Sequence, residues 1–261
     1  MFVLFETCPY ESSIKKAFLC FRCGMANYRR ALQINPAFKK CRYNLDDLGN
    51  FFSKNGECSL AVECFDAALL SNTNFFDAHY GLANALLKCG RTDEAIEHYQ
   101  RAAQLKPDDG ATFNNLGLAL VMKGRSEEAV TNFHQALRLK PDFAEALCNL
   151  GGMFMVQKRY DEAIVSYEAA LRVEANRPET HYSLAQAFCF MGRWDDAALQ
   201  FKDVLSLSPD NPKVHLELGQ VLARLGKPTE AAAEFREALR LKSDFPEAER
   251  ALNELEPSLP K

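Results

Sequence analysis

Residues 115–141 read NLGLALVMKGRSEEAVTNFHQALRLKP, and residues 81–107, 34 positions earlier, read GLANALLKCGRTDEAIEHYQRAAQLKP. Leucine, glycine, alanine, an aromatic residue and proline recur at matching places in the two stretches. The same spacing extends in both directions and produces two regular columns: Ala61, Ala95, Ala129, Ala163, Ala197 and Ala231, and Phe65, Tyr99, Phe133, Tyr167, Phe201 and Phe235. A fixed period of this length indicates stacked copies of one supersecondary unit.

Each 34-residue copy predicts two helices joined by a tight turn. When column one is placed at Arg42, columns four, seven, eight and eleven fall on one helical face, with leucine at seven and a small residue at eight. Glycine follows at column fifteen in every copy except at Lys158, as is usual just after a helix end. The second helix opens on polar and acidic residues, of which Ser, Thr or Asp can cap its free N–H groups. Because such a pair buries its apolar face only against the next pair, the sequence predicts an all-α solenoid of antiparallel helix pairs.

The period also sets the expected boundaries. Residues 1–41 are expected to form a degenerate N-terminal repeat, with its second helix at 28–36. Three extra residues, 39–41, are expected to lengthen the helix that follows. Residues 246–261 predict a polar capping helix with a tail, because the end of a solenoid needs a wet face. Between these ends lie six tandem repeats, at 42–75, 76–109, 110–143, 144–177, 178–211 and 212–245.

Composition and charge disfavour several classes of partner. The formal net charge is -4 and 25% of the residues are charged, so no overall basic character favours nucleic-acid binding. No run approaches the roughly 18 apolar residues that a membrane-spanning helix needs. The apolar opening MFVLF lacks a basic flank and is followed by Glu6, so a signal peptide is not expected. We therefore expect a cytoplasmic protein that binds neither nucleic acid nor membrane.

The chain has nine cysteines. An odd number without a secretory signal disfavours a disulfide framework, so the cysteines within expected helices are interpreted as free, small apolar residues. Cys20 and Cys23 have the spacing of half a zinc site, while Cys8 and Cys41 stand alone instead of forming the second close pair. We therefore expect reduced thiols in this N-terminal group, although the spacing leaves metal binding open.

The sequence contains no catalytic motif that we recognise. The signatures GxSxG, GxxxxGK[ST], GxGxxG and HExxH are all missing from it. His79, His181 and His215 share column four and are expected to be packed between helices and not to act as metal ligands. The recurring acidic pairs follow the recurring helix starts. We therefore expect a protein that is not an enzyme and uses no cofactor or metal.

The columns resemble the tetratricopeptide repeat family over residues 42–245. Leu-Gly in the first helix, glycine at the turn, Ala-x3-aromatic-x2-Ala-Leu in the second helix and a closing proline carry the resemblance. Column four departs from it, because the family often has an aromatic residue there. The resemblance implies a right-handed solenoid whose first helices line a concave groove.

Read in register, that groove has amides on one line and apolar side chains on another in its middle repeats. An Asn amide both donates and accepts, so it can pair with any peptide backbone, and Met adapts to several side-chain shapes. The expected function is a protein–protein interaction scaffold that binds an extended peptide or a helix of a partner in the groove. The candidate groove residues are Tyr80, Asn84, Lys88, Asn114, Asn115, Leu118, Met122, Asn149, Gly152, Met155, Tyr182, Gln186 and Phe190.

Three narrower roles can be compared with the same residues. Family members that hold a chaperone C-terminal carboxylate need basic residues where this chain has Tyr80, Glu145 and Asn149, so that role is not expected. Asn115 and Asn149 are similar to the asparagine ladder of O-linked N-acetylglucosamine transferases, so the alternative function is a substrate-recruiting repeat region of a larger enzyme such as a glycosyltransferase. Self-association through an apolar N-terminal end is a third possibility, suggested by Phe2, Leu4, Phe5, Phe18 and Phe21.

Overall fold

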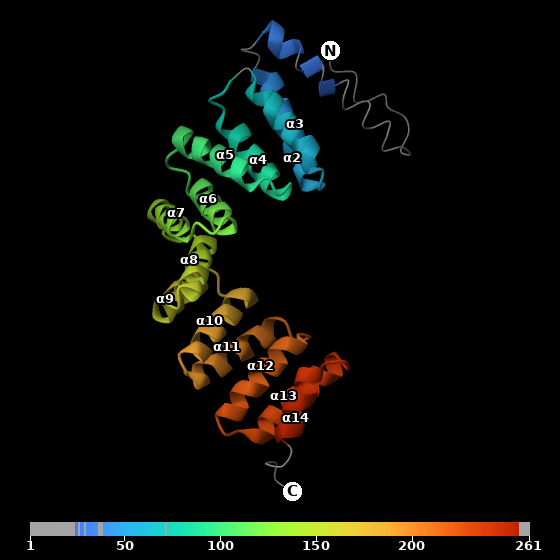
Figure 1. Ribbon diagram of the computed structural model, residues 1–261, viewed down its shortest axis with the longest axis vertical. Helices are drawn as coiled ribbons and strands as arrows, with labels where there is room; N and C mark the ends of the chain where they lie inside the picture. Colours follow the sequence, from blue (N-terminus) through green and yellow to red (C-terminus); the bar gives the residue numbers. More distant parts are fainter. Residues whose placement is uncertain (1–23, 26, 29, 36–38, 71, 256–261) are drawn as a thin grey trace. The chain divides into compact units, whose positions relative to one another are not determined.

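The 34-residue period corresponds to pairs of α-helices in the computed structural model of the chain (Figure 1), which describes residues 24–25, 27–28, 30–35, 39–70 and 72–255. Within those residues all regular secondary structure is helical, as the repeat predicted. The chain divides into two compact units, residues 1–123 and 124–261.

Among its described residues from Lys39 onward, the first unit contains two complete helix pairs and the first helix of a third. Its helices are α2 (Lys39–Lys54), α3 (Cys58–Leu69), α4 (Phe76–Lys88), α5 (Thr92–Leu105) and α6 (Gly110–Met122). Helices α2 and α3 pack together, as do α4 and α5, and each pair is joined to the next by contacts of α3 with α4 and of α5 with α6. Helix α2 also contacts α4, which places successive first helices side by side.

The second unit repeats the same arrangement and ends in a single helix. Its helices are α7 (Ser126–Leu139), α8 (Ala144–Val156), α9 (Tyr160–Val173), α10 (Pro178–Phe190), α11 (Trp194–Leu207), α12 (Pro212–Arg224), α13 (Pro228–Leu241) and α14 (Pro246–Leu255). Helix α14 packs against α12 and α13, in the place where the first helix of another repeat would lie. A capping helix was expected at this position.

The regular columns of the repeat form the core. The six column-twenty alanines, from Ala61 to Ala231, are buried, and the six aromatic residues of column twenty-four are at most 4% exposed. Small residues of the first helices make room for these rings. A Cβ atom added to Gly219 would lie 2.7 Å from Phe235 Cδ1, and one added to Gly49 would lie 2.7 Å from Phe65 Cζ. The small column is therefore required by helix–ring packing.

The turn between the two helices of a repeat needs a left-handed residue. After α4, Gly90 has φ of 76°, its N–H donates to Leu87 O at 3.0 Å, and Arg91 N–H donates to Leu86 O at 2.9 Å. These two bonds satisfy carbonyl groups at the helix end. Lys158 adopts the same conformation with φ of 59° and is the one non-glycine residue with positive φ among the described residues.

The predicted side-chain caps of the second helices are not formed. Helix α5 has Arg91 at its N-cap, and no side chain caps the helix there. Instead the Arg91 guanidinium pairs with Glu94 in the first turn, with 2.6 Å between Nε and Oε1. The same Arg–carboxylate pair occurs at Arg125, Arg159 and Arg193. The polar residue after the arginine, Thr92 in α5, is the first residue of the helix and is therefore not its N-cap.

The N-terminal part is described only in fragments. The described residues between 24 and 34 are helical, and Met25 and Leu32 are buried, in the stretch where the second helix of a degenerate repeat is predicted. Helix α2 begins at Lys39 and has 16 residues where α4 has 13, so the three extra residues do lengthen it. The expected first helix and the apolar residues proposed for self-association lie outside the described residues.

Candidate functional site

The candidate groove residues fall in both units. Tyr80, Asn84, Lys88, Asn114, Asn115, Leu118 and Met122 belong to α4 and α6 of the first unit, and Asn149, Gly152, Met155, Tyr182, Gln186 and Phe190 belong to α8 and α10 of the second. We therefore treat the two groups as two separate predicted binding surfaces, one on each unit.

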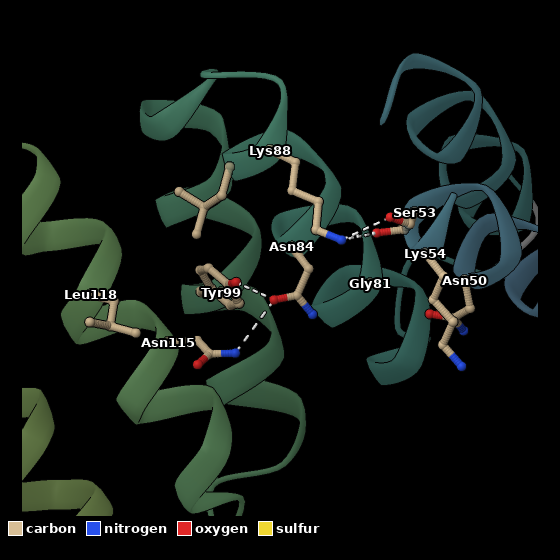
Figure 2. Close-up of a pocket in the computed structure, with 10 residues that line it drawn as sticks. Asn50, Ser53, Lys54, Gly81, Asn84, Lys88, Tyr99, Asn115 and Leu118 are labelled. Atoms are coloured by element: carbon tan, nitrogen blue, oxygen red, sulfur yellow. Dashed lines mark hydrogen bonds between the residues drawn. The ribbon is translucent and has the colours of Figure 1, made fainter. Parts of the chain in front are cut away.

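The first unit contains a hollow between its first helices, shown in Figure 2. Its volume is about 400 Å³, which lies within the usual range for ligand pockets. Side chains from α2, α4 and α6 surround it, and Tyr99 on α5 also lines it. The lining residues are Asn50, Ser53, Lys54, Gly81, Asn84, Leu87, Lys88, Tyr99, Asn115 and Leu118.

A hydrogen-bond network fixes the amide of Asn84 at this hollow. The buried hydroxyl of Tyr99 donates to Asn84 Oδ1 at 2.5 Å, and Asn115 Nδ2 donates to the same oxygen at 3.4 Å. Asn115 Nδ2 also donates to the Tyr80 hydroxyl at 2.9 Å. Because Asn84 Oδ1 already accepts two hydrogen bonds, the amide is oriented with Nδ2 as its remaining donor group. Figure 2 shows this nitrogen pointing away from Tyr99 and Asn115.

Tyr99 is held as a neutral hydroxyl. Its side chain is fully buried, and burial raises its pKa well above the usual value for tyrosine, with the neighbouring Tyr80 adding to the effect. A buried hydroxyl needs a partner, and Asn84 supplies it. Asn84 therefore has a structural role as well as a surface position.

The basic residues of the hollow lie at the C-terminal ends of α2 and α4. Lys88 Nζ donates to the Ser53 carbonyl oxygen at 2.8 Å and lies 3.2 Å from Ser53 Oγ. Lys54 is exposed at the end of α2. These contacts join the C-terminal ends of α2 and α4 (Figure 2).

Several lining residues were missing from the predicted set. Asn50 and Lys54 lie 34 positions before Asn84 and Lys88, so the period places them in the groove columns although they were left out of the candidate set. Tyr99 belongs to a core column, and no sequence signal distinguishes its hydroxyl. Asn114 was predicted as a surface amide but is only 1% exposed, and its Nδ2 donates to Asn115 Oδ1 at 3.3 Å. Column five of this helix faces the interior, so Asn114 is buried and contributes to the site only through its hydrogen bond to Asn115.

Gly81 and Gly152, the two glycines in the candidate surfaces, have different packing environments. A Cβ on Gly81 would lie 2.5 Å from Phe65 Cζ, so close packing requires glycine there. A Cβ on Gly152 would meet only the Tyr167 hydroxyl, at an ordinary 3.8 Å. Packing therefore explains Gly81 and leaves Gly152 unexplained.

In the second unit the predicted residues form a polar and an apolar group. The Tyr182 hydroxyl donates to Glu217 Oε1 at 2.6 Å and accepts from Gln186 Nε2 at 3.0 Å. Phe190 is 64% exposed, and its ring stacks on Tyr160 with 5.0 Å between centroids. These groups link α10 to α12 and to α9.

The column-four histidines are packed, as expected. His215 Nδ1 lies 2.6 Å from Glu234 Oε2 on α13, and its Nε2 lies 3.0 Å from the Pro209 carbonyl oxygen in the preceding loop. His79 and His181 make the equivalent pair of contacts, to His98 and Thr73 and to Gln200 and Ala175. Each histidine ring therefore connects the loop before its own helix to the second helix of the same repeat.

The cysteines correct one prediction. Cys58 at the start of α3 and Cys89 at the end of α4 form a disulfide, with their Cα atoms 5.8 Å apart. Both had been interpreted as free thiols. The pair joins neighbouring repeats directly beside Lys88. Cys41, Cys148 and Cys189 are free thiols, and Cys64 Sγ donates to Met25 Sδ at 3.9 Å. Cys8, Cys20 and Cys23 lie outside the described residues. Among the described residues no cluster of His, Cys, Asp and Glu could hold a metal ion.

The matches to known protein families lie within the repeat region. A sequence profile described as Tetratricopeptide repeat matches residues 114–179 and 182–246, and related profiles match 83–124 and 64–97. The chain belongs to the tetratricopeptide repeat (TPR) family. TPR repeats imply a protein–protein interaction scaffold, and such scaffolds are generally non-catalytic.

Two curated TPR relatives match only part of the chain. Anaphase-promoting complex subunit 3 of Schizosaccharomyces pombe is 35% identical over 88 residues, which cover 34% of this chain and 13% of that protein. The peroxisomal targeting signal receptor of Candida glabrata is 41% identical over 78 residues, or 30% of this chain and 12% of that protein. The chain thus spans a small fraction of the length of each relative.

Solved TPR structures share the fold. YrrB, described as a TPR protein with an unusual peptide-binding site, superposes with a TM-score of 0.64 at 21% identity over 74% of this chain and 99% of that one. PilF of Pseudomonas aeruginosa gives 0.71 at 22% identity over 82% and 97%. These neighbours support an α-solenoid. In the part of the chain that the structure describes, none of the helices has both the length and the apolarity to cross a membrane.

Proposed function

We propose that the TPR scaffold binds an extended segment of a partner protein in the hollow of the first unit. Asn84 Nδ2 donates there to an oxygen of the segment, such as a backbone carbonyl. The observation that carries the proposal is the fixed orientation of this amide, because Tyr99 and Asn115 both occupy its oxygen.

The rest of the lining suits a peptide. Leu87 and Leu118 supply apolar contacts for side chains, while Asn50 adds a second amide on α2. A pre-oriented donor beside apolar surface lowers the ordering cost of binding. Met122 is 61% exposed on α6 and extends the apolar surface beyond the hollow.

The comparisons favour a peptide ligand in general terms. YrrB has the same fold and is described as having a peptide-binding site, and another relative is named as a receptor for a targeting signal. The residues of the second unit, from Asn149 to Phe190, are proposed as a separate binding surface of that unit.

The test uses an isosteric change at Asn84. Asn84→Asp keeps the oxygen that Tyr99 needs and replaces the N–H donors by a carboxylate oxygen. Nine-residue peptides selected from a random display library on the wild-type chain should bind Asn84→Asp at least tenfold more weakly by calorimetry. Asn253→Asp, the same change at an exposed site on α14, should leave affinity unchanged. A library that yields no binder, or binders equally tight on Asn84→Asp, refutes the proposal.

A further inference from the structure

Two histidines of the first unit face each other through the same ring nitrogen. His79 Nδ1 on α4 lies 2.9 Å from His98 Nδ1 on α5, and the ring centroids are 5.1 Å apart. On its other side, His79 Nε2 lies 2.9 Å from the carbonyl oxygen of Thr73, in the loop between α3 and α4. The His79 ring, which is only 8% exposed, therefore connects this loop to α5.

The carbonyl contact determines which nitrogens of the pair carry hydrogen. A carbonyl oxygen only accepts hydrogen bonds, so His79 Nε2 donates to Thr73. The Nδ1 atom of the neutral His79 ring is then an acceptor, because a neutral imidazole carries a single N–H. The donor across the 2.9 Å contact is therefore His98 Nδ1–H. One hydrogen bond, from His98 to His79, holds the two rings together.

The pair can bind one proton without losing this hydrogen bond, but not two. The first proton can bind to His98 Nε2, which leaves the Nδ1–H donor in place. A second proton has to bind to His79 Nδ1, the acceptor of the bond. Two N–H groups and two positive charges would then face each other across 2.9 Å. Coupled groups of this kind bind protons in two separate steps, and here the second step breaks the contact.

The surroundings of the pair do not offset a second positive charge. Burial lowers the pKa of both rings, and the positive charge of Arg101 adds to this effect at His79. Glu94 is the acidic group that acts on the pair, and it already forms a salt bridge with Arg91, whose charge acts in the opposite direction. These charged groups all lie on α5, while Asp66 on α3 acts on Arg91. The charges around the rings therefore favour the state with fewer protons.

Two other repeats have a histidine in the same column but a different partner. His181 Nδ1 lies 2.8 Å from Gln200 Oε1, and His215 Nδ1 lies 2.6 Å from Glu234 Oε2. Gln200 and Glu234 occupy the same column as His98. Neither an amide nor a carboxylate becomes positively charged in acid, so these two contacts never face a histidine with a second cation. Of the three contacts, only the His–His pair becomes a pair of like charges.

We propose that the His79–His98 pair is a pH-sensitive contact that holds the α3–α4 loop against α5 near neutral pH and releases it in acid. The last residue of this loop, Phe75, is only 9% exposed and packs edge-on against Tyr43 of α2, with 5.4 Å between ring centroids. Release of the loop therefore loosens the junction between the α2–α3 and α4–α5 pairs.

The direction of the pH dependence follows from the two protonation steps. A histidine in an unfolded chain binds its proton near pH 6.5, whereas the folded pair binds its second proton only at lower pH. The contact therefore stabilises the fold fully above about pH 6.5, and this contribution is lost as the pH falls below that value. Arg101 also donates to Asn74 Oδ1 in the same loop, so we expect local opening and not unfolding of the whole unit.

Hydrogen exchange followed by mass spectrometry measures the contact in the full chain, with EDTA present so that no metal ion bridges the rings. Protection factors at pH 7.5 and pH 4.5 are compared for residues 72–80 and for the equivalent residues 174–182 around His181. In wild type we expect protection to fall at least tenfold at residues 72–80 between the two pH values, and to stay constant at residues 174–182.

Two variants provide matched comparisons. His98→Gln reproduces the His181–Gln200 pair, so residues 72–80 should keep their protection at pH 4.5. His134→Gln, the same change at an exposed site on α7, should lose protection at residues 72–80 as wild type does. Asp46 is present in all three proteins, so its own titration cancels in the comparison. Protection that falls equally in wild type and in His98→Gln, or that does not fall in wild type, overturns the proposal.

Nitrogen NMR of the wild-type histidine rings tests the hydrogen bond directly and needs no variant. At pH 7.5 we expect the Nε2–H tautomer for His79 and the Nδ1–H tautomer for His98. A spectrum with both rings as Nε2–H tautomers would contradict the hydrogen bond on which the proposal depends. None of these measurements involves a peptide, so they test the contact independently of the proposed function.

Discussion

Tyr99 donates its buried hydroxyl to Asn84 at 2.5 Å, so a core side chain sets the orientation of a surface amide. The column that holds Tyr99 contains phenylalanine in four of the six repeats, at Phe65, Phe133, Phe201 and Phe235. The hydroxyl is thus an addition to a core position that does not otherwise need one. It is a direct link between the packing of the repeat and the candidate site.

This pairing predicts a non-additive pair of substitutions. Asn84→Leu should destabilise the chain by about 1–3 kcal/mol, because it leaves the Tyr99 hydroxyl buried without a partner. Tyr99→Phe should cost less, and adding it to Asn84→Leu should recover part of the loss. Urea unfolding of both single variants and the double variant measures the coupling. Simple addition of the two effects would contradict the structural role of the bond.

The two glycine environments predict opposite effects of the same substitution. Gly219→Ala should destabilise by about 1–3 kcal/mol, because the new methyl group overlaps the Phe235 ring. Gly152→Ala has room and should stabilise by up to about 1 kcal/mol through helix propensity. Thermal unfolding of the pair provides a matched comparison. Equal effects at both sites would show that packing against the ring does not determine the small column.

The Cys58–Cys89 disulfide predicts a redox-dependent stability. The cysteines are 31 residues apart, and closing a loop of that length in the unfolded chain stabilises the fold by about 3–4 kcal/mol in the chain-entropy account. Dithiothreitol should therefore lower the melting temperature of the wild-type chain. The Cys58→Ser/Cys89→Ser variant should melt at the lower temperature with or without the reductant. An unchanged wild-type transition would mean that the bond contributes nothing.

The buried carboxyl of Asp46 should make the free energy of unfolding depend on pH. Burial, and then the charges of Asp77 and Asp47, raise its pKa to about 6, above the value of about 3.9 in an unfolded chain. The folded state therefore holds this proton more tightly than the unfolded state. This tighter binding of the Asp46 proton stabilises the folded state fully below about pH 4, and the stabilisation is lost as the pH rises through about 6.

Asp46→Asn cannot ionise, so it should be more stable than wild type at pH 7.5, with a smaller difference at pH 4. Urea unfolding at the two pH values measures this, and the exposed Asp47→Asn should show a smaller pH-dependent difference. A difference that is the same at both pH values would mean that ionisation of Asp46 is not its cause.

The sequence alone predicted the helix pairs, the glycine turn, the longer α2 and the capping helix α14. Those features depend on periodic burial and local backbone preferences, which each repeat carries in its own residues. The same information placed Asn84, Lys88 and Asn115 together, because equivalent columns of neighbouring repeats share a face.

Only the tertiary structure decided the rest. These features are the Cys58–Cys89 bond, the burial of Asn114, the orientation of Asn84 by Tyr99 and the burial of the Asp46 carboxyl. All of them depend on contacts between different helices or on which side of a helix faces the interior. The repeat pattern fixes which column a residue occupies. The distances between side chains, and the partners they find, arise only when neighbouring helices pack.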